Sequence, residues 1–427
     1  MRVVHAADLH IDSPMVGLDQ YPGCPAAALR GATRRAFDNV VAVCLQEQAQ
    51  LLLLAGDIFD GDWPDYHSGL YFHAALAPLA EAGVTVLVVR GNHDAANEMT
   101  RSLRPPPHVH VFSESGPTTW KDERLGVAVH GMSYPQRDVR TDLVPAYPDP
   151  VPALLNLGLL HTNVGAVPGH ANYAPSSLAG LLARGYDYWA LGHVHQHAIL
   201  ARAPWVVYPG NTQGRSVRET GPKGVLVIDV DDASRRITDV RRVETDVARW
   251  AHLVIDVGPD DGVEDLVQAA VNAVRGASST SASAGGGRML AVRLELRGAT
   301  RAHERVAANP EAIVQQLRAD VAGIGAEVWV EKVKLHTRSP IDALAASAGL
   351  ARELSALLTE LEGDPARLRA LLGEDLRALE TVQPLFRRQD HEPERVDVPQ
   401  PGDDTWLTGL LPRARDLLTA RLAGDGA

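Results

Sequence analysis

The sequence is poor in cysteine and has no excess of positive charge. Its 427 residues include only two cysteines, Cys24 and Cys44, too few for a disulfide framework or a thiolate zinc site, so any metal must have other ligands. The 41 lysines and arginines are outnumbered by 53 acidic residues, which gives a formal charge of −12. Such a chain repels nucleic acid as a whole, which excludes a non-specific DNA coat protein. It does not exclude an enzyme that cleaves phosphodiesters, because divalent cations and local arginines supply positive charge at a site.

Long hydrophobic runs are also absent. The strongest candidate, residues 51–55, ends at Gly56 and Asp57, far short of the ~18 apolar residues that a membrane span needs. Near the N-terminus, Asp8 and Asp12 interrupt any apolar core of a signal peptide. We therefore expect a cytoplasmic protein with no membrane contact.

Over residues 2–232, short β-branched runs alternate with amphipathic stretches. The runs predict strands at 2–7, 51–55, 84–89, 109–112, 126–132, 154–160, 186–191, 206–208 and 224–230, and the stretches predict helices at 27–50, 68–82 and 176–183. Several strands are apolar on both faces, as in layered α/β proteins. We therefore predict an α/β fold with sheet inside and helices outside, over a first domain at 1–235.

The rest of the chain predicts two further parts. A small α/β domain at 245–338 contains strands at 252–257, 288–296 and 327–335 and helices at 263–274 and 310–322. Residues 276–287 are almost only Ser, Ala and Gly, and predict a flexible loop. Leucines at helical spacing then predict a helical C-terminal region at 340–427.

Metal-capable side chains follow five of the predicted strands. The segments are Asp8-Leu9-His10, Gly56-Asp57 to Asp60, Gly91-Asn92-His93-Asp94, His161, and Gly192-His193-Val194-His195. Open α/β sheets bind ligands at the carboxyl ends of their strands. The two-residue period places both side chains of Asp-x-His or His-x-His on one side of the chain. Carboxylate, amide and imidazole ligands suit Mn²⁺, Fe²⁺ or Zn²⁺, and the set is too large for one ion but fits two ions that share a carboxylate.

Each segment alone has a simpler explanation. Asp-x-His is a weak motif, Gly-Asn-His-Asp is compatible with a turn, and Gly-His-x-His is compatible with a strand that ends in two solvent-facing histidines. All five in this order, each after a strand, favour a metal site over these alternatives.

This order of motifs resembles the calcineurin-like metallophosphoesterase superfamily over about residues 1–230. More narrowly, the chain resembles the SbcD-type nuclease subunit of bacterial double-strand-break repair complexes, and especially the YhaO branch. The segments that carry this resemblance are 56–63, 161–163, 186–195 and 208–224. It implies a two-sheet sandwich flanked by helices, a capping domain at 245–338, and C-terminal helices that either dock a partner's coiled coil or pack on the capping domain.

The resemblance also implies roles for the site residues. One ion would be bound by Asp8, His10, Asp57 and His195, and a second by Asp57, Asn92, His161 and His193. Asp57 would bridge the two ions, which would most naturally be Mn²⁺, with Fe²⁺ or Zn²⁺ as alternatives. The nucleophile would be a metal-bound hydroxide. His93 would face the scissile phosphate, stabilising charge or protonating the leaving oxygen, and Asp60 would orient His93.

Arg215 and Arg218 follow the last ligand strand. Either they grip a DNA phosphate, or they pair with nearby acids. Residues 1–230 carry 16 basic and 21 acidic residues and the remainder 25 and 32, so neither part is basic. We therefore expect stable binding to DNA to require a homodimer, an SbcC-type coiled-coil ABC ATPase, or both.

The predicted function is hydrolysis of DNA phosphodiesters in double-strand-break repair, as an exonuclease with or without endonuclease activity. The first alternative is a phosphatase or small-nucleotide phosphodiesterase of the same superfamily, which the second domain and helical tail make less natural. The second alternative is a non-catalytic scaffold, which is disfavoured because no predicted ligand is missing.

Overall fold

The computed structural model describes residues 1–15, 18, 23–60, 67–96, 104–166, 171–281, 287–325, 327–339, 350–373 and 403–424. The chain forms two compact units. The first contains Met1–His252, Ala277–Arg293 and Ala326–Glu331, and the second contains Leu253–Gly276, Leu294–Gly325 and Lys332–Ala427.

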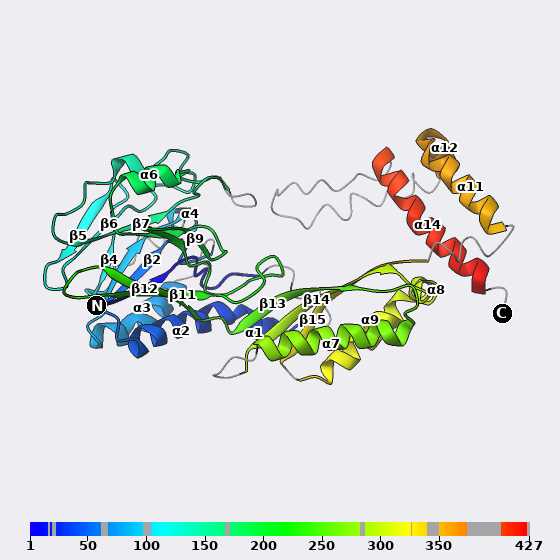
Figure 1. Cartoon of the computed structure of the whole chain (residues 1–427), viewed down its shortest axis with the longest axis horizontal. Helices are drawn as coiled ribbons and strands as arrows, with labels where there is room; N and C mark the ends of the chain where they lie inside the picture. The colour runs from blue at the N-terminus through cyan, green and yellow to red at the C-terminus, as the bar shows by residue number, and fades with distance from the viewer. Residues whose placement is uncertain are drawn as a thin grey trace. The chain divides into compact units, whose positions relative to one another are not determined.

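The first unit contains a sheet of six strands in the order β12-β11-β1-β2-β3-β4. Four of its strands run parallel to their neighbours: β1 (Arg2–Ala6), β2 (Leu51–Ala55), β3 (Thr85–Val89) and β4 (Val109–Val111). β11 (Gly224–Val230) pairs antiparallel with β1, and β12 (Ile237–Glu244) pairs antiparallel with β11. The sheet is therefore mixed, with its parallel part on the side of β4 (Figure 1).

A second six-stranded sheet has the order β5-β6-β7-β8-β10-β9. Its parallel strands are β6 (Val127–Gly131), β7 (Leu155–His161), β8 (Tyr188–Gly192) and β10 (Trp205–Tyr208). β5 (Thr118–Asp122) and β9 (Ala198–Arg202) pair antiparallel at its two edges.

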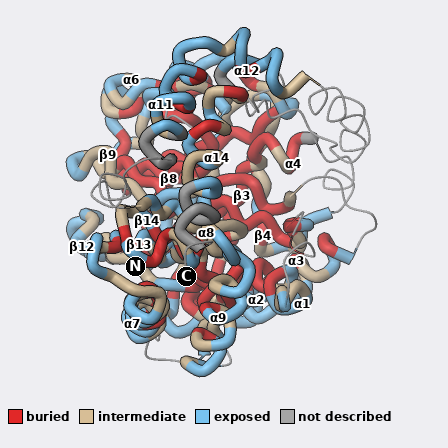
Figure 2. The backbone as a smooth tube through the Cα atoms, turned by 90° about the vertical axis from the view of Figure 1, so that its right-hand side faces the viewer, coloured by how far each residue is buried: buried red, intermediate tan, exposed pale blue. Residues whose placement is uncertain are grey.

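The two sheets pack face to face because successive side chains of each strand alternate between two apolar environments. Leu51 and Leu53 face the second sheet, where they share a core with Val129 and Leu157. Leu52 and Leu54 face the opposite way, toward the helices α2 (Ala32–Gln46) and α3 (His67–Glu81). Strands such as β3 and β8 are consequently buried along most of their length (Figure 2).

Short helices complete this unit. They are α1 (Ala26–Arg30), α4 (Asn92–Ala96), the 3₁₀ helix η2 (Val144–Ala146) and α6 (Leu178–Ala183), which packs on the outer face of the second sheet through Leu181. The predicted two-sheet α/β sandwich with flanking helices is confirmed.

A third sheet has the order β13-β14-β15, formed by β13 (Ala248–Asp256), β14 (Met289–Ala299) and β15 (Val328–Arg338). The helices α7 (Val263–Ser281), α8 (His303–Ala308) and α9 (Pro310–Ala322) connect its strands. Each strand begins in the first compact unit and ends in the second. The three-domain division of the sequence therefore stays a prediction.

The described C-terminal helices are α11 (Leu350–Glu362), α12 (Pro365–Leu371) and α14 (Asp404–Gly424). They share a small leucine core formed by Leu358, Leu361, Leu368, Leu407 and Leu411. Within the described ranges, no helix is long and apolar enough to cross a membrane.

Two sequence predictions were wrong in detail. The helix predicted at 27–50 is two helices, α1 and α2, which meet at Gly31. The segment predicted as a loop at 276–287 is helical as far as Ser281, where α7 ends. The Arg288 guanidinium donates to the Ser281 carbonyl at 2.9 Å and so supports this last turn. Tertiary contact here outweighs the weak helix propensity of Ser and Gly. Residues 282–286 lie outside the described ranges.

Replacing Gly158 by Ala tests how tightly the second sheet is packed. Gly158 lies opposite Trp189 on the neighbouring strand, and a Cβ atom there would lie 2.3 Å from the indole ring. The indole ring is held in place, because its Nε1 donates to the Leu181 carbonyl at 3.0 Å. We expect Gly158→Ala to lower the free energy of unfolding by about 1–3 kcal/mol, measured as a lower urea midpoint. Gly116→Ala, where no atom lies within 4 Å, is the matched control, and equal midpoints for the two variants would contradict the packing argument.

Candidate metal centre

The predicted ligands lie where parallel strands end. Asp8 and His10 follow β1, Asp57 follows β2, Asn92 begins α4 after β3, His161 ends β7, and His193 and His195 follow β8. Backbone hydrogen bonds join the first two loops: the amide of Asp8 donates to the Gly56 carbonyl at 3.0 Å, and the amide of His10 donates to the Asp57 carbonyl at 3.1 Å. Segments far apart in the sequence thus meet at one edge of the sandwich.

Glycines allow this close approach. A Cβ atom at Gly91 would lie 2.2 Å from Asp57 Oδ1, and a Cβ atom at Gly192 would lie 1.9 Å from the Ala55 carbonyl oxygen. A side chain at either position would therefore separate the strand ends. Asp57 itself has a left-handed backbone with φ of 51°, and such uncommon conformations concentrate at functional sites.

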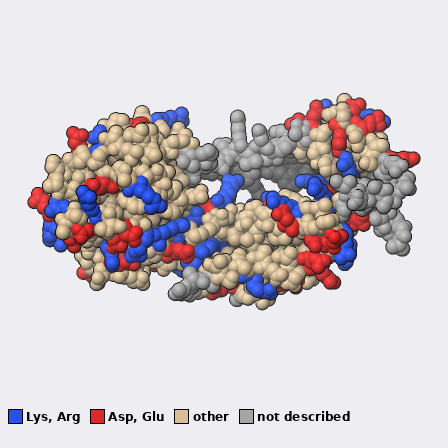
Figure 3. Space-filling view, in the orientation of Figure 1, with Lys and Arg blue, Asp and Glu red and all other residues tan. Residues whose placement is uncertain are grey.

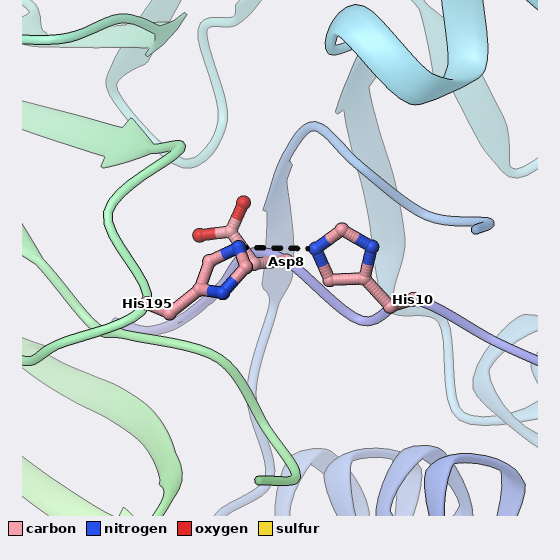
Figure 4. A group of neighbouring side chains, drawn as sticks. All are labelled: Asp8, His10 and His195. Carbon is pink, nitrogen blue, oxygen red and sulfur yellow. Dashed lines mark hydrogen bonds between the residues drawn. The ribbon is translucent and has the colours of Figure 1, made fainter. Parts of the chain in front are cut away.

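One cluster is formed by Asp8, His10 and His195, whose ligand atoms all lie within 4.8 Å of one another. The Nε2 atoms of His10 and His195 face each other at 3.1 Å (Figure 4). His195 donates its Nδ1 proton to Glu219 Oε1 at 2.7 Å, which leaves its Nε2 as an acceptor. Two nitrogens that bind one ion at ~2.0–2.1 Å lie about 3.0–3.4 Å apart, so this spacing suits a shared cation.

A second cluster is formed by Asp8, Asp57 and His161, again within 4.8 Å. His161 donates from Nδ1 to the Ala55 carbonyl at 2.8 Å, which directs Nε2 toward Asn92 Oδ1 at 3.1 Å and Asp57 Oδ2 at 3.4 Å. An imidazole nitrogen, an amide oxygen and a carboxylate oxygen therefore converge on one point.

His193 joins this second group less directly. Its ring lies against that of His161, with 5.2 Å between ring centroids, but its Nε2 donates to the Ala171 carbonyl at 2.7 Å. This ring would therefore bind an ion through Nδ1. Its backbone amide donates to both carboxylate oxygens of Asp8, at 3.0 and 3.1 Å, and so fixes that ligand as well.

The donor set fits two divalent cations. In each cluster, ring nitrogens and carboxylate oxygens that can act as ligands converge within 4.8 Å, which is the arrangement that a bound cation requires. Asp8 lies in both clusters, and Asp57 contacts His161 of the second.

The pKa values of the second cluster reflect this arrangement. Burial lowers the pKa of His161, but the charges of Asp57 and Asp8 outweigh burial and raise it to about 9. Burial raises the pKa of Asp57, but His161 and His93 hold it well below its usual range. At neutral pH, the metal-free chain therefore contains an ionised Asp57 beside a protonated His161.

His93 and Asp60 lie beside the ligands. The Nδ1 atom of His93 lies 3.2 Å from Asp60 Oδ1, and its backbone amide donates to Asp57 Oδ1 at 3.0 Å. The His93 side chain is 29% exposed, whereas that of His161 is fully buried. His93 is therefore more accessible to a substrate than His161, and than His195, whose side chain is 18% exposed.

Sequence reasoning missed the role of Asp94, although it is the fourth residue of the Gly91 segment. Its buried carboxylate accepts the backbone amides of Ile58, Phe59 and Gly91 at 2.9–3.1 Å. Asp94 thus holds the loop of Asp57 against the loop of His93. The motif includes this acid, but spacing alone does not show which amides it accepts.

Sequence reasoning also missed Glu219. Both of its carboxylate oxygens are used: Oε1 accepts from His195, and Oε2 accepts from Asn211 Nδ2 at 2.9 Å. A carboxylate behind a ligating histidine fixes its tautomer and orientation. Glu219 lies within a segment that suggested the family, but 24 residues separate it from His195, and no periodic pattern connects the two.

The two predicted substrate arginines differ in environment. Arg215 pairs with Asp60 at 3.0 Å and with Glu219 at 3.1 Å, so the structure shows the ion-pairing alternative for this residue. Arg218 is exposed.

Comparison with known families agrees with this geometry. Residues 1–197 match the family model described as calcineurin-like phosphoesterase. Over these residues the chain is similar to the calcineurin-like phosphoesterases. Residues 250–338 match the model described as the middle domain of metallophosphoesterase YhaO. The predicted superfamily and its YhaO-type branch are therefore confirmed.

Curated relatives are similar to the chain over part of their length. An uncharacterized metallophosphoesterase YhaO from Bacillus subtilis is 34% identical over 234 residues, 54% of this chain and 57% of the relative. A DNA double-strand break repair protein Mre11 from Haloferax volcanii is 28% identical over 273 residues, 62% of this chain and 57% of the relative. A subunit of the nuclease SbcCD from Rhodobacter capsulatus is 34% identical over 102 residues, 23% of each chain. The matches thus span at most a little over half of these relatives.

Metal binding should stabilise the first unit. A cation that binds only the folded chain adds about 2.7 kcal/mol at a concentration 100 times its Kd. We expect 1 mM MnCl₂ to raise the Tm by about 5 °C or more. Asp57→Asn should lose most of this shift, because the amide removes a carboxylate charge from the second cluster. Asp239→Asn, an exposed acid on β12, should keep it, and an equal Mn²⁺ shift in both variants would argue against the assignment.

The affinity for Mn²⁺ should rise with pH. His161 has a pKa of about 9 in the metal-free chain, so below pH 9 its Nε2 carries a proton that an ion must displace. We expect the apparent affinity to increase by up to about tenfold per pH unit between pH 6 and 9. Calorimetric titration in buffers of different ionisation enthalpy should show about one proton released per ion at this site. Binding without proton release at pH 7 would contradict this protonation state.

Proposed function

We propose that the chain is a DNA phosphodiesterase that uses two divalent metal ions, Mn²⁺ in the first instance, and acts as an exonuclease in double-strand-break repair. One observation carries the proposal: two clusters of buried acceptors share one edge of the sandwich, and the partly exposed His93 lies beside them. The choice of DNA is supported by the relatives described as the repair protein Mre11 and as part of the nuclease SbcCD.

The ligands would be divided between two ions. Asp8, His10, Asp57 and His195 would hold the first ion, and Asp57, Asn92, His161 and His193 would hold the second. When bound, such a pair of ions lowers the pKa of water and neutralises charge on the phosphate oxygens. The chain itself fixes the ligands: Glu219 orients His195, the Ala55 carbonyl orients His161, and the His193 amide orients Asp8.

His93 would act on the phosphate and the leaving oxygen. Burial lowers the pKa of His93, but Asp60 and Asp57 outweigh burial, so the pKa of His93 lies above its ordinary value. The ring is therefore protonated more readily than an ordinary histidine, and in its protonated form it can donate a proton or stabilise negative charge. Because Asp60 lies at Nδ1, the Nε2 atom is the one that would face the substrate.

The partners follow from charge. Lys and Arg are interspersed with Asp and Glu on the face drawn in Figure 3, and the chain carries a net charge of −12. We therefore propose that firm binding of DNA requires a homodimer, an SbcC-type coiled-coil ATPase, or both. Leu357, Leu371 and Leu417 are exposed on the C-terminal helices and would contact the ATPase, whereas the exposed Arg218 would contact a DNA phosphate.

The test measures nucleotide release from end-labelled linear duplex DNA with Mn²⁺, with EDTA, and with a His93→Gln variant. We expect activity that vanishes in EDTA and falls by about 10²- to 10⁴-fold in the variant, because the Gln amide is not an acid that can transfer a proton at neutral pH. The variant should keep the Mn²⁺-induced rise in Tm, which separates loss of chemistry from loss of metal. His252→Gln, an exposed histidine, is the matched control and should cleave as the wild type does.

An aryl phosphodiester assayed in parallel separates the alternatives. Cleavage of the aryl ester without cleavage of DNA, with the ATPase partner present, would favour a small-molecule phosphodiesterase. No hydrolysis of either substrate by a chain that binds Mn²⁺ would overturn the proposal.

A further inference from the structure

The guanidinium of Arg215 connects two carboxylates that serve different histidines. Its Nη1 donates to Asp60 Oδ2 at 3.0 Å, and its Nη2 donates to Glu219 Oε1 at 3.1 Å and also lies 3.3 Å from His195 Nδ1. The other oxygen of Asp60 lies 3.2 Å from His93, and Glu219 Oε1 also accepts from His195. A continuous path of polar contacts therefore runs from the phosphate-facing histidine to a metal ligand.

The remaining positions on both carboxylates are filled by fixed donors. Ser13 Oγ donates to Asp60 Oδ2 at 2.6 Å. On the other acid, Oε2 accepts Asn211 Nδ2 at 2.9 Å and the backbone amide of Arg215 at 2.8 Å. Arg215 thus holds Glu219 through both its backbone and its side chain, which sets the distance between the two acids.

These acids need a shared cation. The side chains of Asp60 and Glu219 are only 17% and 14% exposed, so water screens their mutual repulsion poorly. A planar guanidinium donates to two carboxylates at once from a rigid fork, whereas an ammonium ion is a point charge that cannot hold both in this geometry. Both ends of the fork are engaged by protein groups, which leaves Arg215 poorly placed to grip a phosphate.

We propose that Arg215 is a positioning residue, which couples the placement of His93 through Asp60 to the metal ligand His195 through Glu219. This inference rests on the proposed metal site. Loss of Arg215 would weaken the binding of the ion held by Asp8, His10 and His195. It would also misplace His93, although Arg215 contacts neither the ion nor the substrate.

The experiment titrates Mn²⁺ into the full chain and follows free Mn²⁺ by electron paramagnetic resonance. We expect two binding constants, and we expect Glu219→Gln and Arg215→Met each to weaken one of them about tenfold or more, as is usual for residues that support a ligating histidine. Arg215→Lys should also weaken it, because Lys keeps the charge but not the fork. Arg236→Met, an exposed arginine between β11 and β12, is the matched control and should leave both constants unchanged.

Double variants test the coupling itself. Arg215→Met combined with Glu219→Gln should weaken Mn²⁺ binding no more than either change alone, and Arg215→Met combined with Asp60→Asn should lower kcat less than the product of the single losses. Asp60→Asn alone should lower kcat.

Two results would overturn the proposal. One is an Arg215→Met variant whose Mn²⁺ binding constants lie within twofold of those of the wild type. The other is a double variant whose loss of Mn²⁺ affinity or of kcat equals the product of the two single losses. If circular dichroism shows that Arg215→Met does not fold, the isosteric Glu219→Gln and Arg215→Lys, which keeps the charge, test the same proposal. The Mn²⁺ titration does not depend on hydrolysis. A chain that binds two Mn²⁺ ions but cleaves no substrate would therefore refute the proposed function, while the titration would still show whether Arg215 supports metal binding.

Discussion

The buried carboxylate of Asp57 is the constraint on which the site depends. An ionised carboxylate in a protein interior costs several kcal/mol unless charge and hydrogen bonds compensate it. Here the compensation comes from the His93 amide at Oδ1 and the His161 ring near Oδ2. Asp94 fixes the surrounding loop by accepting the Ile58 amide, and Gly91 leaves room for the carboxylate oxygen. The sheet ends are thus shaped around one negative charge, which the protonated His161 compensates and which a bound cation would compensate in its place.

The ligands could be predicted from sequence because each belongs to a short motif directly after an apolar strand. The carboxyl ends of parallel strands lie at the same edge of a sheet, regardless of the sequence elsewhere in the chain. The short motifs after the strands were therefore enough to predict that Asp8, Asp57 and His161 lie together. The central strands were equally visible, since β2 and β7 are buried throughout. Among the described residues, the ligand positions therefore required no knowledge of how the intervening loops fold.

The missed features share a different physical origin. Strands β5, β9 and β12 lie at sheet edges and are only partly buried, so their sequences carry no apolar alternation to recognise. Glu219 and Arg215 act through tertiary contacts with residues 24 and 155 positions away, and such contacts leave no periodic signal. Supporting residues are thus harder to predict than ligands, because their spacing depends on the fold and not on one element.

The acidic composition and the proposed substrate are reconciled at the site itself. Asp8 and Asp57 carry two negative charges, and the pair of Asp60 and Glu219 with Arg215 carries one more. Two divalent ions would contribute four positive charges, which would offset the negative charges of these acids and of the nearby buried Asp94 where a phosphodiester must bind. Metal binding would therefore supply attraction for the substrate as well as chemistry. Under the proposed function, such an acidic chain would bind one phosphate at the metal site while the rest of its surface repels the same strand. Affinity along the DNA would then come from a second chain or another protein.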